Sequence, residues 1–233
     1  MCGRYTVHDA ARAAETYKAA GQVIEEIGAR YNVAPSQRLP VIRSGESGWQ
    51  GEAMRWGLVP FWDKSEKPKI APINARAEEA LEKATFKQAL QRRRCLVIAD
   101  GFYEWQRLSE ALKTPFFIGL RDGRPFTIAG VFEEADEKRP ATFALLTTGP
   151  NELMTPIHNR MPLILSSEDE KRWLEPGPIT AEDLANYAKP YPAEQMQTFA
   201  VSRLANNPRN DLPACVRPAV EEEFTLDGGP NSL

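Results

Sequence analysis

The second residue of the sequence, Cys2, offers the most reactive chemistry in the chain. A small residue after the initiator methionine permits removal of Met1, so we expect the mature chain to begin at Cys2. An N-terminal cysteine carries an α-amine and a thiol on adjacent carbons, with ordinary pKa values of about 8 and about 8.5. Each group therefore has a usable nucleophilic fraction at neutral pH.

Two reactions are open to this aminothiol. The amine can act as the base for a thiol that attacks an acyl group, as in N-terminal-nucleophile hydrolases. Alternatively, the amine can condense with an aldehyde to give an imine, which the thiol then closes to a five-membered thiazolidine. A cysteine at position 2 without any chemical role is the third interpretation, and Cys2 alone does not decide among the three.

A carboxyl group lies among aromatic residues in the segment DGFYEW at 100–105. In a strand, Phe102 and Glu104 would face one side, and Tyr103 and Trp105 the other. A carboxyl in apolar surroundings has a raised pKa, which suits a general acid or base near neutrality. A structural ion pair between Glu104 and an arginine is the alternative.

Two further segments carry side chains that can hold an oxygen atom or move a proton. Asn74 and Arg76 stand at the start of an expected helix, where an amide and a guanidinium can hold a carbonyl or phosphate oxygen. Helix capping plus a surface arginine is the alternative for this pair. His158 lies in a proline-bounded loop before an expected strand, where it can carry a proton, although a single histidine is more often structural.

Aromatic residues and prolines gather in two segments, WGLVPFW at 56–62 and YNVAP at 31–35. Exposed aromatic side chains on loops can stack on the bases of a single strand. Packing in the core is the default role of such residues, and we expect it for at least half of them.

The cysteines and histidines argue against a metal site and a disulfide framework. Cys2, Cys95 and Cys215 are widely spaced, and only His8 and His158 supply imidazoles, with no C-x-x-C or H-x-x-x-H spacing. We interpret Cys95 and Cys215 as small buried hydrophobic residues. No apolar run is long enough to span a bilayer, and the first twenty residues lack a signal-peptide layout. We therefore expect a cytoplasmic protein with no metal, no cofactor and no membrane partner.

The 233 residues, 42% of them hydrophobic and 26% charged, suit one large soluble domain. The patterns predict an α+β fold, a single mixed domain with a substantial antiparallel sheet over residues 1–220, followed by an acidic, flexible tail at 221–233. Helices are predicted over 9–20, 77–91, 167–174 and 180–188. Gly21 is expected to stop the first of them, and a capping box at Ser167–Glu170 to open the third. The strands predicted are 116–120 and 126–130, joined as a hairpin by a turn at Asp122-Gly123, and 143–147.

The formal net charge of −3, from 29 basic and 32 acidic residues, argues against a protein that coats nucleic acid. Four of these carboxylates, however, lie in the tail at 221–223 and 227. Without them, 29 basic residues face 28 acidic ones, and the body has a net charge of +1. A short cleft lined by a few arginines is therefore compatible with the composition.

Taken together, these segments resemble the SRAP family, the SOS-response-associated peptidase or abasic-site-processing proteins. The matching pieces follow the order of the family over most of residues 2–218: CGRY at 2–5, NVAPS at 32–36, RWGLVPFW at 55–62, INARAE at 73–78, RRCLVIADGFYEW at 93–105, PFF at 115–117, AGVFE at 129–133 and IHNRMPLIL at 157–165.

The resemblance implies a protein that binds single-stranded DNA and links covalently to abasic sites through a thiazolidine. The name of the family also includes a peptidase activity. It implies a curved, barrel-like antiparallel sheet with flanking helices. By position, it implies that Cys2 supplies amine and thiol, that Asn74 positions the cysteine and the sugar, that Glu104 moves protons and that His158 assists sugar opening and reversal. It also implies that Arg4, Arg76 and Arg160 bind the DNA backbone and that the Thr147 hydroxyl lines the site. Among the residues expected to contact DNA we also count Thr147, Pro35 and Trp62.

Three functional hypotheses follow. The first is a DNA-damage protein that crosslinks to abasic single-stranded DNA and shields the lesion, acting as a monomer in the cytoplasm and on the nucleoid. The second is an amidohydrolase or peptidase that uses an N-terminal Cys2. The third is a single-strand binding module without covalent chemistry.

Overall fold

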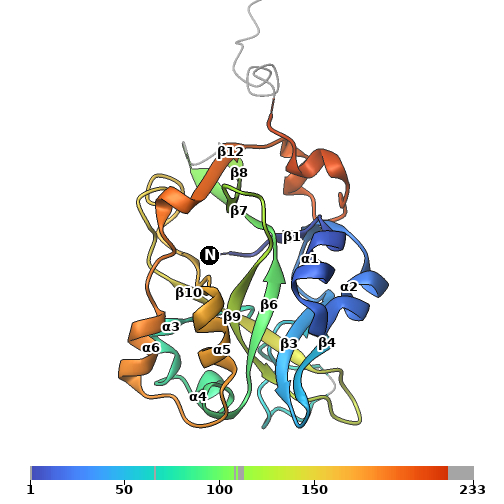
Figure 1. The fold of residues 1–233 in the computed structure, drawn as a ribbon, viewed down its shortest axis with the longest axis vertical. Coiled ribbons are helices and arrows are strands. Elements are labelled where there is room, and N and C mark those ends of the chain that lie inside the picture. The colour runs from blue at the N-terminus through green and yellow to red at the C-terminus, as the bar shows by residue number, and fades with distance from the viewer. Residues whose placement is uncertain (1, 66, 108, 110–112, 220–233) are drawn as a thin grey trace, which may run out of the picture.

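The computed structural model describes residues 2–65, 67–107, 109 and 113–219 (Figure 1). The helices of this part of the chain are α1 (Ala10–Thr16), α2 (Gly21–Ile27), α3 (Ala77–Ala80), α4 (Ala84–Arg92), α5 (Ser167–Leu174) and α6 (Ala181–Tyr187), with short 3-10 helices η1 (Lys18–Ala20), η2 (Ala193–Gln195), η3 (Arg203–Asn206) and η4 (Pro213–Val216). No helix among the described residues is long and apolar enough to cross a membrane.

The strands form two sheets. The first has the order β12 (Met196–Ala200), β8 (Lys113–Leu120), β7 (Gly101–Arg107), β1 (Tyr5–Val7) and β2 (Arg30–Val33). The second has the order β11 (Met161–Pro162), β10 (Thr142–Thr148), β4 (Gly48–Trp56), β3 (Arg38–Gly45), β6 (Arg94–Ala99) and β9 (Phe126–Glu133), while β5 (Asn74–Arg76) pairs with β10.

The second sheet closes on itself, because β10 pairs with β4 on one side and with β9 on the other. The pairing of β10 with β9 is antiparallel, whereas β10 runs parallel to both β4 and β5. This partly closed sheet confirms the predicted α+β fold with a barrel-like sheet, and adds two parallel pairings that the sequence did not indicate.

One continuous core fills the barrel and extends under the helices. Its largest fully buried side chains include Trp56, Trp173 and Tyr5. The Tyr5 ring meets Trp56 edge-on at 5.1 Å, and the Trp173 indole N–H donates to the Cys95 carbonyl. In Figure 1, α1 and α2 cover the right of the barrel while α4, α5 and α6 lie at the lower left.

The N-terminal segment is bound to the strand that carries Glu104. Strand β1 pairs antiparallel with β7, in the register Tyr5 opposite Phe102. The Tyr103 backbone N–H also donates to the Arg4 carbonyl, which extends the ladder toward Cys2. This pairing brings residues 2 and 104 into one region of the fold.

Two of the predicted helices are each interrupted. The segment 9–20 forms α1 only to Thr16, and Gly21 does not stop a helix but begins α2 with right-handed helical backbone angles. The segment 77–91 divides into α3 and α4, because Lys83 takes an extended conformation. This break lets Ala80 and Phe86, on different helices, both reach the core.

The predicted hairpin of β8 and β9 is wrong. The chain does turn at Asp122-Gly123, with a positive φ at Gly123, but β8 pairs with β7 and β12 while β9 pairs with β6 and β10. Both strands are largely buried, so each gains more from two partners in its own sheet than from pairing across a local turn.

The helix over 167–174 is confirmed, but its cap is not Ser167. The Ser166 hydroxyl accepts from the Asp169 backbone N–H, and Glu170 faces the interior. The strand over 143–147 is confirmed, and so is the helix over 180–188, where Thr180 and Asp183 form a capping box. The predicted tail at 221–233, and its boundary at 220, lie outside the described residues.

Candidate functional site

Cys2 is completely buried, and a single side chain fixes its carbonyl group. The Asn74 amide Nδ2 donates to the Cys2 carbonyl oxygen at 2.7 Å. Asn74 sits at the start of β5, opposite Leu145 of β10, so the barrel determines its position. The other amide atom, Asn74 Oδ1, is buried and has no hydrogen-bond partner within the described structure. The amide nitrogen of Asn74 thus binds Cys2, while its oxygen remains available as a hydrogen-bond acceptor.

The Cys2 thiol is held in its protonated form. Burial raises its pKa well above the ordinary value, and the negative charge of Glu104 raises it further. Its nearest acceptor is the Arg4 carbonyl, 3.7 Å from Sγ. A thiol in this environment needs a neighbouring group to take its proton before it can act as a nucleophile.

Glu104 supplies the negative charge that acts on this thiol. The alternation predicted for β7 is confirmed, since Phe102 belongs to the main core whereas Tyr103 packs in a second cluster with Phe117. Glu104 is only 3% exposed, and its burial raises the pKa of its carboxyl despite the opposing charge of His158. Glu104 Oε1 lies 4.0 Å from His158 Nδ1, so this carboxyl pairs with a histidine.

His158 lies in the loop between β10 and β11, on the solvent side of Glu104. The Arg160 backbone N–H donates to His158 Nδ1 at 3.1 Å, which fixes the ring in place. The side chain is 25% exposed. His158 can therefore pass protons between the buried carboxyl and a group bound from solvent.

Arg160 is held against the protein by hydrogen bonds to two residues, Glu78 and Thr147. Its guanidinium donates to both carboxylate oxygens of Glu78, at 2.9 Å each, and to the Thr147 carbonyl oxygen at 2.6 Å. Thr147 Oγ1 also accepts from Arg160 at 3.2 Å and lies buried beside β5. Burial alone would raise the pKa of Glu78, but Arg160 outweighs that effect and lowers it.

Arg4 and Arg76 differ in how firmly other residues hold their guanidinium groups. Arg4 donates to Asn32 Oδ1 and to the Ala205 carbonyl, both at 2.8 Å, and its guanidinium lies over the Trp105 ring. Arg76 is exposed and pairs only with the exposed Glu79 at 3.0 Å. An exposed pair of this kind is worth little, so Arg76 can exchange Glu79 for another anion.

Residues of this cluster line two grooves. One, of about 870 Å³, is lined by Arg4, Glu104, Trp105, Arg107, Lys113 and His158 among others. Another, of about 590 Å³, is lined by Ile70, Asn74, Arg76, Lys83 and Phe86 among others. Glu104 and His158 therefore face the first groove, and Asn74 and Arg76 the second.

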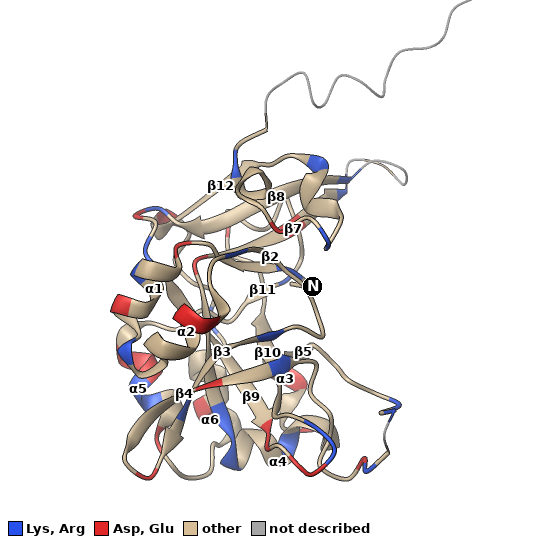
Figure 2. Cartoon of the chain, turned by 90° about the vertical axis from the view of Figure 1, so that its right-hand side faces the viewer, with Lys and Arg blue, Asp and Glu red and all other residues tan. Residues whose placement is uncertain are grey.

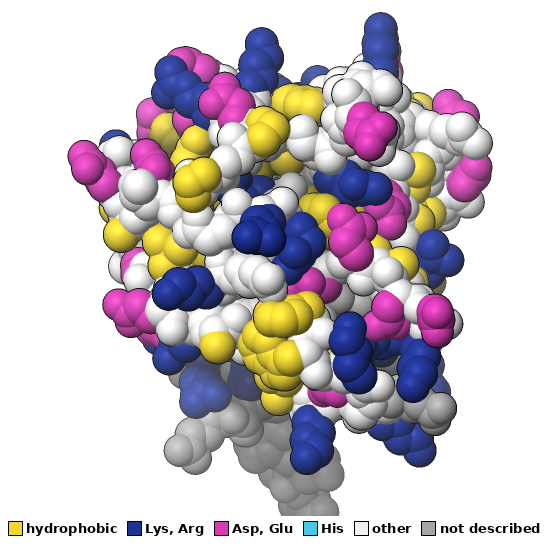
Figure 3. Space-filling view, turned by 90° about the horizontal axis from the view of Figure 1, so that it is seen from below, with side chains coloured by type: hydrophobic (Ala, Val, Ile, Leu, Met, Phe, Trp, Pro, Cys, Tyr) yellow, Lys and Arg dark blue, Asp and Glu magenta, His cyan; other side chains and the backbone are white. Residues whose placement is uncertain are grey.

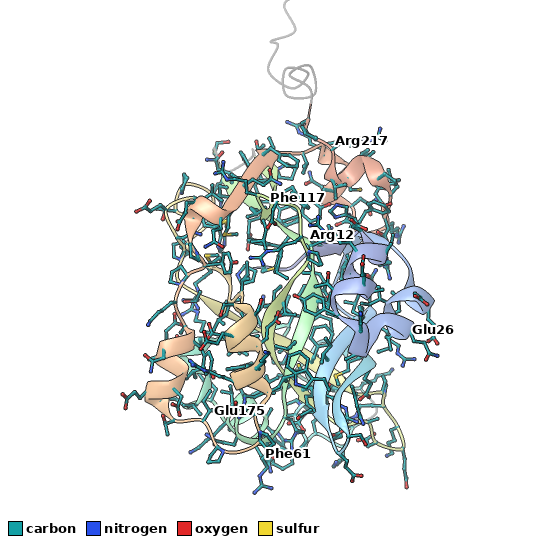
Figure 4. The ribbon with its side chains drawn as sticks, viewed as in Figure 1. Arg12, Glu26, Phe61, Phe117, Glu175 and Arg217 are labelled. Carbon is teal, nitrogen blue, oxygen red and sulfur yellow. The ribbon has the colours of Figure 1, made fainter. Side chains whose placement is uncertain are left out.

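Pro35 and Trp62 lie at exposed positions. Trp62 is 46% exposed and Phe61 44%, and their rings meet edge-on at 5.0 Å. Pro35 is exposed too, just before Ser36, whose φ is +75°. Figure 4 places Phe61 at the lower end of the molecule, and Figure 3 shows apolar side chains gathered on that face beside basic ones. Trp56, in contrast, is core.

Sequence reasoning missed several residues of this region. Asn32 is buried and donates from Nδ2 to three backbone carbonyls while its Oδ1 accepts from Arg4. Glu78, which holds Arg160, and Trp105, which stacks on Arg4, were also missed. Only Trp105 left a usable signal, because Arg107 follows it at the strand period and lines the same groove.

No group of three or more His, Cys, Asp or Glu side chains in the described ranges could hold a metal ion. Cys95 and Cys215 are both buried thiols, as expected for small hydrophobic residues.

A barrel-like α+β domain with a buried cysteine at position 2, beside Asn74 and Glu104, defines a recognisable class of protein. The family model described as SOS response associated peptidase (SRAP) matches residues 1–208. The chain therefore belongs to the SRAP family.

Curated relatives carry a common name. The abasic site processing protein YoqW of Bacillus subtilis is 40% identical over 231 residues, which cover 93% of this chain and 99% of that protein. The abasic site processing protein YedK of Escherichia coli is 32% identical, covering 83% of this chain and 86% of that protein. A crystal structure of a protein from Bacteroides thetaiotaomicron matches with a TM-score of 0.82 at 28% identity, over 94% of this chain and 100% of that one.

Proposed function

We propose that this protein processes abasic sites in DNA: after loss of Met1, it forms a covalent thiazolidine with the ring-opened sugar of an abasic site in single-stranded DNA. The observation that carries the proposal is the placement of Cys2 between Asn74, which holds its carbonyl, and the buried Glu104, whose charge acts on its thiol. The names of the relatives support the lesion as substrate.

The reaction balances with the residues at hand. The Cys2 amine adds to the sugar aldehyde carbon, and the carbinolamine loses its hydroxyl as water to leave a protonated imine. Glu104, whose raised pKa favours its protonated form, supplies the proton for that water and becomes a carboxylate. The thiol then returns a proton to the Glu104 carboxylate, and its sulfur adds to the carbon of the protonated imine to close the neutral thiazolidine. His158, between Glu104 and solvent, assists ring opening and the reverse reaction.

The Asn74 side chain can bind the α-amine that the proposed loss of Met1 would release. The buried acceptor Asn74 Oδ1 stands on the amide that already binds the Cys2 carbonyl. An N–H of the released α-amine would satisfy it, and the lone pair of that amine would then be directed toward the sugar. An unsatisfied buried acceptor costs about 1–3 kcal/mol, so this contact would favour the productive rotamer.

The remaining positions would hold the strand. Arg76 can exchange Glu79 for a phosphate, Arg4 borders the larger groove, and Arg160 would contact the strand from its position beside Thr147. Pro35 and Trp62 offer exposed surfaces on which bases can stack. We propose that the protein acts as a monomer in the cytoplasm, associating with the nucleoid at damaged DNA.

The test is a denaturing gel of protein with a single-stranded oligonucleotide that contains one abasic site. Mass spectrometry first establishes that the chain begins at Cys2. We expect a heat-resistant shifted band with the wild type and with Cys215→Ala, and no such band with Cys2→Ala. A wild type that binds the oligonucleotide without a covalent band is a binding module, and Cys2-dependent cleavage of amides without a band indicates a hydrolase. Either result overturns the proposal.

A further inference from the structure

A cavity of about 790 Å³ lies away from Cys2, between α1, α5 and the turn that joins β8 to β9. Figure 2 shows α1 and α5 toward the left of the molecule and β5, which holds Asn74, toward the right. None of the residues assigned to the site around Cys2 lines this cavity. Its volume is in the range of sites for small organic molecules.

The floor of the cavity holds a buried carboxylate. Glu170 is 8% exposed, and its Oε1 accepts from the Tyr17 hydroxyl at 3.0 Å and from the Thr127 hydroxyl at 2.7 Å. No hydrogen bond from the described residues reaches Glu170 Oε2, which stays accessible in the cavity. Burial raises the pKa of Glu170 in spite of these two hydroxyl groups.

This carboxylate has no cation in contact. Within the described ranges, no lysine, arginine or histidine lies within 4.0 Å of Glu170, although a buried carboxylate is costly without a charged or strongly donating partner. The charge of Arg124 acts on Glu170, but its guanidinium contacts the Tyr191 hydroxyl at 3.2 Å and Asp122 at 3.2 Å, the latter in an exposed pair that another anion can replace. A bound molecule with N–H donors would complete the environment of Oε2.

The other residues that line the cavity are aromatic or charged. Tyr17, Tyr187 and Tyr191 line it with flat, partly apolar surfaces, Arg124, Arg172 and Lys189 bring positive charge, and Asp169 adds a second carboxylate. A ligand matched to this lining has N–H donors for Glu170, a planar body and an anionic group.

We propose that this cavity is a second binding site that takes a nucleotide, with the base edge on Glu170 and the phosphate on Arg124 and Lys189. The exocyclic amino group of guanine can donate to Glu170 Oε2, the oxygen that Tyr17 and Thr127 leave accessible, so a guanine nucleotide should bind. The volume suits a nucleotide, whereas a free amino acid would leave much of it empty.

Titration of the ¹⁵N-labelled full chain with dGMP, followed by NMR, tests this site. We expect saturable shifts at residues lining the cavity, and a loss of affinity of about tenfold for Glu170→Gln or Lys189→Gln, the effect of one charged hydrogen bond. Deoxyguanosine, which lacks the phosphate, should be weakened to a similar degree, and the exposed Glu182→Gln should match the wild type.

The proposal is overturned if dGMP shifts no cavity resonance, or if its shifts are confined to the grooves around Cys2. It is overturned equally if inorganic phosphate or free lysine reproduces the shifts and Glu170→Gln changes nothing. Thermal unfolding of each variant verifies its fold, and Lys189→Gln, an exposed change, keeps the test valid if Glu170→Gln is unstable. Crosslinking through Cys2 should stay unchanged in both variants.

Discussion

Glu104 is the residue on which the proposed chemistry depends most, since a buried carboxyl with a raised pKa can both give and take protons near neutrality. We expect Glu104→Gln to slow crosslinking at saturating DNA by about 100-fold, the typical effect of losing a general acid or base. The single-turnover rate measured by quenched gel assays checks this value. Unchanged DNA affinity in the same variant separates lost proton transfer from lost binding.

The same substitution has a defined effect on stability. Because the folded pKa of Glu104 lies above its unfolded value near 4.5, its contribution to stability is full below that value and is lost as pH rises through the folded pKa. Wild type should therefore lose stability relative to Glu104→Gln as the pH rises above about 4.5. Urea unfolding at several pH values measures the difference, and parallel stability curves would contradict the raised pKa.

Asp100 determines how two strands of the site meet. Its buried carboxylate accepts from the Thr6 hydroxyl at 2.5 Å and the Asp9 backbone N–H at 2.8 Å, and lies 2.8 Å from His8 Nδ1, so it ties β1 to the start of β7. We expect Asp100→Asn to destabilise the fold by about 1–3 kcal/mol, because an amide satisfies these donors poorly. Denaturant unfolding tests this, with the exposed Asp122→Asn as control; equal stabilities would refute it.

At the scale of helices and strands, several elements could be predicted from the sequence, but the pairing of the strands could not. The strands around Glu104 and Thr147 follow clear alternation and apolar runs, and the Thr180 cap is a local signal. The separation of β8 from β9 is not local: the Asp122-Gly123 turn is compatible with a hairpin, and only the competing partners β7 and β6 decide. The breaks at Gly21 and Lys83 likewise depend on packing in the core.

The site was predicted as a set of residues, not as an arrangement. Cys2, Asn74, Glu104 and His158 could be named from motifs, and all four converge in the structure. The contacts of Glu78 with Arg160, and of Asn32 with Arg4, join residues far apart in the chain and leave no periodic signal.

Over the described part of the molecule, basic and acidic residues are mixed, as Figure 2 shows, so the proposed affinity for DNA would come from a few arginines. If Arg4, Arg76 and Arg160 each bind one phosphate, as the proposed function requires, the salt slope for single strands is about −2. Arg76→Gln should make that slope less negative by about 0.7, whereas Arg12→Gln, on α1, should leave it unchanged. Binding anisotropy at several salt concentrations measures both, and equal slopes for all three proteins would exclude a role for Arg76.

The intact mass of the product formed with an abasic oligonucleotide tests the central claim most directly. Imine formation releases one water and thiazolidine closure releases nothing, so the adduct should weigh one water less than protein plus oligonucleotide. Peptide mapping should place it on the peptide that begins at Cys2, and borohydride should not be needed to preserve it. An adduct on a lysine, one that survives only after reduction, or no adduct from a chain beginning at Cys2 would contradict the proposed chemistry.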